Sequence, residues 1–226
     1  MKNRVITISR EFGSGGRTIG KKVAEKLGIP CYDRTLILKT AEKSGLSPDF
    51  IARAEERARS RFHMSIAPIG IGAPTMSSHG IPVSHQAFFA QSDVIRELAD
   101  QGPCVIVGRC ADYILRDDPR RLSVFVHAPL DERVRRAREE YGVQEPNLES
   151  FVLRQDKARA SYYNYFATGK WGQSREYDLC VNSHMGIAAA VAVIKAAALA
   201  VAAEASALAA ARFALAAAVL ALDTDS

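Results

Sequence analysis

The fold is decided by the stretch ITISREFGSGGRTIG, residues 6–20, in which an apolar run leads through a glycine-rich turn into an amphipathic helical pattern. Residues 5–9 are rich in β-branched side chains, which is typical of a parallel strand buried on both faces. Gly13, Gly15 and Gly16 follow, and glycine allows the positive φ angles that turn backbone N–H groups inward. The start of a helix adds unpaired N–H groups and the positive end of its dipole. The stretch therefore predicts a cradle for an anion such as phosphate.

The turn fits a known phosphate-binding template incompletely. Against G-x-x-x-x-G-K-[ST], residues 11–18 keep Gly16 and Thr18, whereas Glu11 replaces the first glycine and Arg17 replaces the lysine. A guanidinium still supplies positive charge, but its planar fork differs from the compact ammonium of lysine. The residues predicted to form the cradle are Gly13, Ser14, Gly15, Gly16, Arg17 and Thr18.

Two rival interpretations of the same turn stay open. The template G-x-G-x-x-G of dinucleotide-binding turns fits Gly13 and Gly15 but needs glycine where Thr18 stands. Asp33 follows Gly13 by twenty residues, where that template wants an acid for the ribose. The other rival is a glycine-rich connection from strand to helix that binds nothing.

Length and composition fit one α/β domain with an embellishment. The chain has 226 residues, a formal net charge of +5 and a pI near 9.1, which favours anionic ligands without selecting a class. The four cysteines form no C-x-x-C pair and are interpreted as reduced thiols, and the five histidines show no metal-ligand spacing. Residues 1–4 lead directly into the first strand without the apolar segment of a signal peptide, so we expect a cytoplasmic protein.

Apolar runs and helical patterns alternate along the chain, which predicts an α/β fold with a five-stranded parallel sheet and helices on both faces. The expected strands are residues 5–9, 31–33, 104–108, 122–128 and 177–181. The expected helices begin near residue 16 and then cover residues 35–44, 48–62, 86–101, a short piece ending at 115, 130–141 and 148–163. Residues 63–85 are rich in proline, glycine, serine and methionine, which indicates a long irregular segment, either a functional lid or disordered.

Polar residues at the carboxyl ends of parallel strands are candidates for ligand binding, because the strands deliver them to one edge of the sheet. Arg109 follows the strand at 104–108, and Asp33 ends the short second strand. The helix at 130–141 is dense in arginine and is interpreted either as a solvated face or as a set of cations on a lid. Its candidate lid residues are Arg133, Arg136 and Arg138.

From residue 186 onward the composition collapses to alanine with valine and leucine, which predicts one long helix over 186–226. Alanine is only weakly apolar and charged residues interrupt the run, so no membrane span is expected. We expect the first turns to pack on the sheet and the remainder to contact another subunit, as in a homo-oligomer.

The order of five motifs resembles the cytidylate kinase-like family, which is related to bacterial cytidylate kinases among the P-loop nucleoside monophosphate kinases. The motifs are the glycine-rich turn, Tyr32-Asp33-Arg34, IVGRCAD at 106–112, QDKARASYY at 155–163 and YDLCVNS at 177–183. The resemblance spans about residues 4–195. It implies a P-loop kinase core over 1–185, with a helical insertion for the nucleoside monophosphate at about 35–92, a lid at about 130–172, and a C-terminal helical extension over 186–226.

The resemblance also implies ATP-dependent phosphoryl transfer, with Mg²⁺, to a nucleoside monophosphate such as CMP or dCMP. Gly13 to Thr18 would hold the phosphates of ATP, and Thr18 would help to bind the metal. The catalytic cations would be Arg17, Arg109 and Arg159, and the lid would carry Arg133, Arg136 and Arg138. The substrate-binding residues would be Asp33, Arg34, Arg109, Asp112, Asp156 and Arg159. Cys110 and Gln155 stand where related cytidylate kinases have an acid and an arginine.

Two other functions stay open at this point. One is a nucleotide-sensing or interaction module that kept the fold but lost the lysine of the phosphate-binding template. The other is a kinase that acts on a different phosphorylated or hydroxyl-bearing small molecule. We expect neither nucleic acid nor a membrane as a partner.

Overall fold

The computed structural model describes residues 4–33 and 83–200. The predicted helices at 35–44 and 48–62, nearly all of the irregular segment at 63–85, Arg34 and the part of the tail beyond residue 200 lie outside the described residues.

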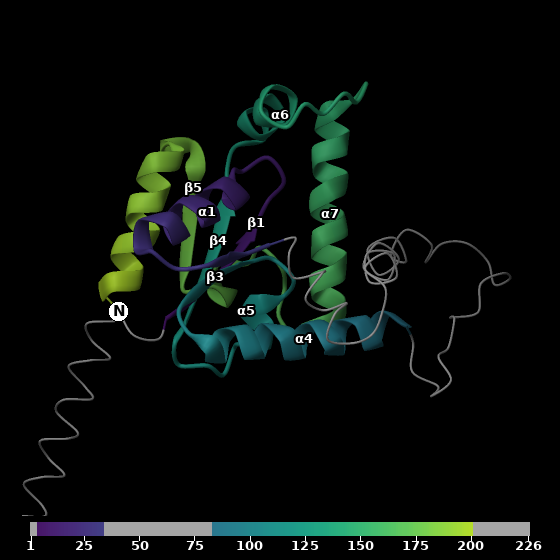
Figure 1. Cartoon of the computed structure of the whole chain (residues 1–226). Coiled ribbons are helices and arrows are strands. Elements are labelled where there is room, and N and C mark those ends of the chain that lie inside the picture. The colour runs from purple at the N-terminus through teal and green to yellow at the C-terminus, as the bar shows by residue number, and fades with distance from the viewer. Residues whose placement is uncertain (1–3, 34–82, 201–226) are drawn as a thin grey trace, which may run out of the picture.

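A five-stranded parallel sheet forms the centre of the protein, in the order β2-β3-β1-β4-β5 (Figure 1). The strands are β1 (Val5–Arg10), β2 (Cys31–Tyr32), β3 (Cys104–Val107), β4 (Arg121–His127) and β5 (Leu179–Asn182). In the register of the central strands, Val5 lies opposite Cys104 on one side and Arg121 on the other. The five predicted strands are thus confirmed, with ends that differ by one or two residues.

Helices follow the strands as the alternating pattern predicted. They are α1 (Gly16–Leu27), α4 (Val83–Gln101), α5 (Ala111–Ile114), α6 (Leu130–Glu139) and α7 (Leu148–Phe166), with the short 3-10 turns η2 (Ser174–Glu176) and η3 (Ser183–Met185). A further helix runs over residues 187–200. None of the helices within the described ranges is long and apolar enough to cross a lipid bilayer.

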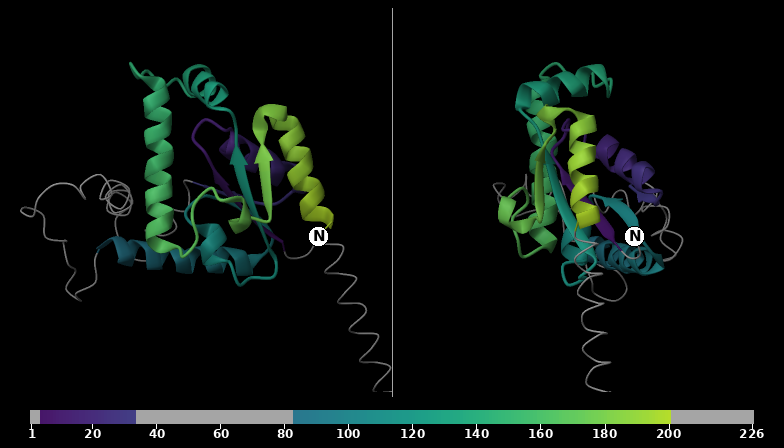
Figure 2. Two further views of the ribbon diagram at one scale, coloured as in Figure 1. Left: turned by 180° about the vertical axis from the view of Figure 1, so that it is seen from behind. Right: turned by 90° about the vertical axis from the view of Figure 1, so that its left-hand side faces the viewer.

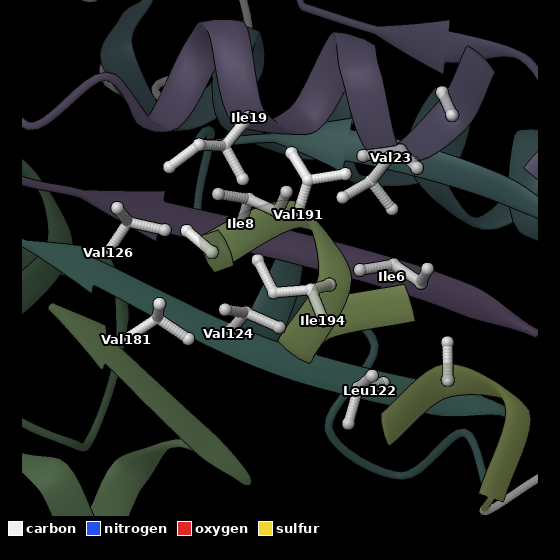
Figure 3. Close-up of a cluster of buried hydrophobic side chains, with 14 of the residues drawn as sticks. Ile6, Ile8, Ile19, Val23, Leu122, Val124, Val126, Val181, Val191 and Ile194 are labelled. Carbon is white, nitrogen blue, oxygen red and sulfur yellow. The ribbon is translucent and has the colours of Figure 1, made fainter. Parts of the chain in front are cut away.

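Each face of the sheet is covered by its own apolar cluster. On one face, α1 and the helix at 187–200 pack against β1, β3, β4 and β5 (Figure 3). Side chains from all of these elements interdigitate there, including Ile8, Ile19, Val124 and Ile194. On the other face, α4, α5 and α7 cover β1 and β3 with Ile95, Leu98 and Tyr163 among others. The prediction that the first turns of the alanine-rich helix pack on the sheet is confirmed.

Strand β1 sits between β3 and β4, and it is buried from Val5 to Ser9. Its side chains alternate between the two faces, so that Ile6 and Ile8 point toward α1 while Val5 points toward α4. Arg10 is the last residue of β1, and by this alternation its side chain lies on the same face of the sheet as that of Ile8. After Arg10 the chain leaves the sheet at the carboxyl ends of its strands, beside the end of β4 and the start of α6 (Figure 2).

Candidate phosphate-binding site

Residues 11–15, which connect β1 to α1, are predicted to bind phosphate, and we call them the phosphate loop. Gly13 and Gly15 have φ angles of 79° and 77°, in the left-handed region that glycine reaches without strain. Gly15 is the N-cap of α1 and no side chain caps the helix, so the N–H groups of its first turn have no partner within the helix. The predicted helix start at residues 16–18 is confirmed at Gly16. The loop and the positive end of α1 together form a site suited to an anion.

Close packing leaves the loop no room for larger residues. A Cβ atom at Gly13 would collide with the backbone of Arg133, and one at Gly15 would lie 2.6 Å from Cδ1 of Ile187. The glycines are therefore required by the approach of α6 and of the helix at 187–200, as well as by their φ angles.

Five consecutive carbonyl groups, from Arg10 to Ser14, accept hydrogen bonds from donors of the protein itself. Their donors are Arg159 Nη1 to Arg10 at 3.1 Å, Ser14 Oγ to Glu11 at 2.9 Å, Arg133 Nη1 to Phe12 at 3.4 Å, Arg136 Nη1 to Gly13 at 2.6 Å and Ser183 Oγ to Ser14 at 2.6 Å. In a trans peptide the C=O and the following N–H point in opposite directions. Fixing the carbonyls therefore also fixes the directions of the loop N–H groups.

Carboxylates complete this support. Asp156 Oδ1 accepts the N–H of Phe12 at 2.6 Å, and Asp156 Oδ2 forms an ion pair with Arg133. Glu11 Oε2 accepts the N–H of Ala128 at 3.1 Å and lies 3.3 Å from Arg133 Nε. We call Arg133, Arg136, Asp156, Arg159 and Ser183 the loop clamp.

The clamp differs from the roles that the sequence analysis gave to its members. Arg133 and Arg136 were expected as lid cations that close over the transferred group, yet each is only 5% exposed and holds the loop from behind. Asp156 and Arg159 were expected at the acceptor phosphate, but they bind Phe12 N–H and Arg10 O. The reason is that α6 and α7 pack against each other beside the loop, which turns these side chains onto its backbone. Arg138 is the exposed member of the lid set.

The cation in the lysine position of the template is already paired. Arg17 Nε binds Asp33 Oδ2, and the side chains are 50% and 14% exposed. Asp33 follows β2 directly, so the pair joins the first turn of α1 to the carboxyl edge of the sheet. Thr18 is half-buried in the same turn of α1. The structure thus pairs Arg17 with Asp33 at the start of α1, while the roles predicted for Arg17 and Thr18 at the donor phosphates and for Asp33 in binding substrate stay predictions.

The chain takes a strained path at the end of β3. Gly108, Arg109 and Cys110 have φ angles of 78°, 63° and 55°, and for the two non-glycine residues this conformation costs about 1–2 kcal/mol each. Gln91 on α4 donates from Nε2 to the Arg109 carbonyl at 3.2 Å, and Arg109 Nη1 lies 3.5 Å from Gln91 Oε1. Arg109 is therefore held at the carboxyl edge, where it was predicted.

Asp112 does not reach that edge. The residue is 3% exposed and lies beneath the sheet, where its Oδ1 accepts from the Ser9 hydroxyl at 3.3 Å. Burial raises the pKa of its carboxyl group, and hydrogen bonds from Tyr163 and Ser9 lower that pKa by smaller amounts. Asp112 was expected to bind substrate, but in the structure it links β1, α5 and α7.

Two residues at the site were missed from the sequence. Arg10 lies with its side chain across Gly16 and Gly108, and its position as the last residue of β1 was the signal available. Tyr141, just beyond α6, packs edge-on against Phe12 with ring centroids 5.8 Å apart. Burial raises the pKa of Tyr141, while Arg136 and the Gly15 N–H lower it, so its hydroxyl lies beside the phosphate loop. No pattern in the sequence marks Tyr141.

Comparisons with known proteins identify the family and the fold of the chain. The sequence model of the cytidylate kinase-like family matches residues 5–185, whereas no curated protein matches the chain. An uncharacterized protein from Eubacterium ventriosum is 29% identical, with a TM-score of 0.60 over 85% of this chain and 96% of its own.

Two solved kinase structures match the chain at lower identity. A gluconokinase from Sinorhizobium meliloti is 17% identical, with a TM-score of 0.50 over 87% of this chain and 91% of its own. A shikimate kinase from Bacteroides thetaiotaomicron is 16% identical, with a TM-score of 0.48 over 85% and 96%. Because the family match covers most of the chain and includes the phosphate loop, the end of β3 and β5, the protein belongs to the cytidylate kinase-like family of P-loop kinases.

Proposed function

We propose that the protein transfers the terminal phosphoryl group of ATP to a nucleoside monophosphate of the CMP or dCMP kind. The observation that supports this most directly is the phosphate loop, whose five carbonyls are bound from behind by the protein. Because the Glu11, Phe12 and Ser14 N–H groups are bonded within the protein, the held loop leaves the first-turn N–H groups of α1 as the donors fixed in direction before any ligand arrives. Phosphoryl transfer depends on such positioning and on fixed positive charge more than on covalent chemistry.

The donor side uses the residues at the start of α1. The N–H groups of Gly16, Arg17 and Thr18 bind the phosphate oxygens of ATP, and the Arg17 guanidinium turns from Asp33 toward the transferred group. The Thr18 hydroxyl suits Mg²⁺, which takes few protein ligands and completes its shell with phosphate oxygens and water. When bound, Mg²⁺ neutralises charge on the phosphates.

The acceptor side uses the edge formed by the ends of β2 and β3. Arg109 binds the phosphate of the monophosphate through its planar fork. Asp33 lies at the same edge, and the proposal adds Arg34, the insertion at about 35–92 and the lid at about 130–172 as the parts that bind the acceptor and enclose the substrates. The proposed kinase core covers residues 1–185, and the helix at 187–200, which packs on the same sheet, begins the C-terminal extension proposed over 186–226.

A coupled assay for ADP tests this function with CMP, dCMP, UMP and AMP as acceptors. We expect turnover with a cytidine nucleotide, and a loss of about 10²-fold or more in Arg17→Ala, because a cation that meets transition-state charge is then missing. Arg96→Ala removes a 55% exposed arginine of α4 and should leave the rate unchanged. ATP binding without ADP formation from any acceptor would instead indicate a nucleotide-binding module.

A second candidate is a kinase for a hydroxyl-bearing small molecule, and the position of Asp33 favours it. Asp33 is a largely covered carboxylate at the carboxyl edge, in contact with Arg17. A hydroxyl acceptor needs a general base to take its proton, whereas a phosphate acceptor is already anionic. Asp33→Asn should therefore lower kcat by about 10²-fold or more with a hydroxyl acceptor, and only slightly with a nucleoside monophosphate.

A further inference from the structure

The Arg10 side chain connects the two halves of the candidate site. Its stem lies on the first residue of α1, where a Cβ atom at Gly16 would be 2.5 Å from Arg10 Cβ and 2.9 Å from Cγ. Its head lies on the end of β3, where a Cβ atom at Gly108 would collide with Nη1 and lie 3.1 Å from Cζ. Two glycines from distant parts of the chain thus leave the channel that the arginine fills.

Hydrogen bonds to backbone groups fix both ends of this channel. The Arg10 carbonyl accepts from Arg159 at 3.1 Å, and Arg10 pairs with Val126 in the register of β1 and β4. The Gly108 N–H donates to Ile8 at 2.9 Å, which ties the end of β3 to β1. The Arg10 guanidinium is therefore carried by rigid elements to a place between the phosphate loop and the turn that bears Arg109.

The surroundings of Arg109 show that the two arginines reach the end of β3 from different faces. Arg10 lies against Gly16 of α1, whereas Arg109 lies against Gln91 of α4. A phosphate group placed at this end of β3 could accept planar, two-pronged hydrogen bonds from both guanidinium groups. The stem of Arg10 also lies on Gly16, beside the loop that would hold the donor.

We propose that Arg10 binds the anionic group of the acceptor together with Arg109, and that the acceptor therefore carries a phosphate or a comparable multivalent anion. The inference rests on the proposed phosphoryl transfer and adds to it a residue that selects the acceptor. The phosphate loop and α1 hold ATP without Arg10, whose head lies on the β3 side. Loss of the guanidinium should accordingly weaken binding of the acceptor and leave binding of ATP unchanged.

The test measures two constants in the Arg10→Gln variant, the KM of the acceptor and the KM of ATP. We expect the KM of the monophosphate to rise about 10- to 100-fold, the loss typical of a charged hydrogen bond, with the KM of ATP changed less than about twofold. Gly108→Ala keeps the arginine but fills the space of its head, and should raise the same KM. Arg96→Gln, which removes an exposed charge on α4, should change neither constant.

Two further measurements decide between a binding role and a structural one. Arg10→Lys keeps the stem and the charge but not the fork, so its KM should lie between those of the wild type and Arg10→Gln, at an unchanged melting temperature. If Arg10→Gln unfolds, the Arg10→Lys and Gly108→Ala variants carry the test. A wild type that turns over a monophosphate while all three variants keep its KM overturns this inference alone. A wild type that neither binds nor phosphorylates any of the four monophosphates overturns the proposed function as well.

Discussion

Replacing Asp156 with alanine removes the acceptor of the Phe12 N–H and the partner of the Arg133 guanidinium at once. The Arg133 side chain is only 7% exposed, and Asp156 is 13% exposed, so water replaces the lost contacts poorly. Removing one partner of such a buried pair costs about 3–5 kcal/mol. Arg133 keeps Glu11 at 3.3 Å and the Ala128 carbonyl at 3.1 Å, which places the expected loss at the lower end, about 3 kcal/mol.

Urea and thermal unfolding followed by circular dichroism measure this loss. For a chain of this length, about 3 kcal/mol lowers the melting temperature by about 6–12 °C. Calorimetry should also show weaker ATP binding, because the phosphate loop loses a hydrogen bond that fixes its direction. Glu139→Ala, which breaks the exposed pair with Arg135 on α6, should cost less than about 0.5 kcal/mol.

A double-mutant cycle with Arg133→Met decides whether the pair is the cause. The double variant no longer buries Arg133 without Asp156, so it should be more stable than the sum of the single losses predicts, with a coupling of about 1–3 kcal/mol. Losses that add within about 0.5 kcal/mol would refute the reasoning, since independent sites behave in that way.

Two other predictions concern buried titratable groups. Burial raises the pKa of the Cys104 thiol to about 12, so iodoacetamide at mildly alkaline pH should modify the exposed Cys180 well before Cys104. Mass spectrometry of the labelled native protein measures the order of modification. Fast labelling of Cys104 would contradict its burial. Burial also raises the pKa of Asp112, so the folded state keeps a proton that the unfolded state releases above about pH 4, and stability falls as the pH rises from there through the raised pKa. The melting temperature of the wild type should therefore fall relative to that of Asp112→Asn over this pH range. The control Asp117→Asn, at an 88% exposed position, should follow the wild type. Parallel curves of melting temperature against pH for all three proteins would contradict the prediction.

The sequence was sufficient to predict the sheet and the position of the phosphate loop, because local patterns carry both. Alternating runs of β-branched and helical residues marked every strand, and the glycines of residues 13–16 marked the turn. Arg109 was predicted correctly at the carboxyl edge, since its place after an apolar strand determines where it emerges.

The clamp was beyond prediction because it depends on contacts between distant segments. Arg133 and Arg136 carry the same charge as their exposed neighbour Arg135, and only the approach of α6 to the loop buries two of the three. Asp156 was predicted to bind substrate, yet it binds an amide 144 positions away. Helical spacing identifies which residues share a face, but it does not identify what that face will meet.

The distance in sequence between the phosphate loop and its supports has a consequence for synthesis. The loop leaves the ribosome more than a hundred residues before Arg133, Asp156 and Ser183 do. Contacts of such long range form late, after the intervening chain has closed. We therefore expect a nascent chain stopped before residue 183 to carry an incompletely supported phosphate loop, so that affinity for ATP would report synthesis past that residue.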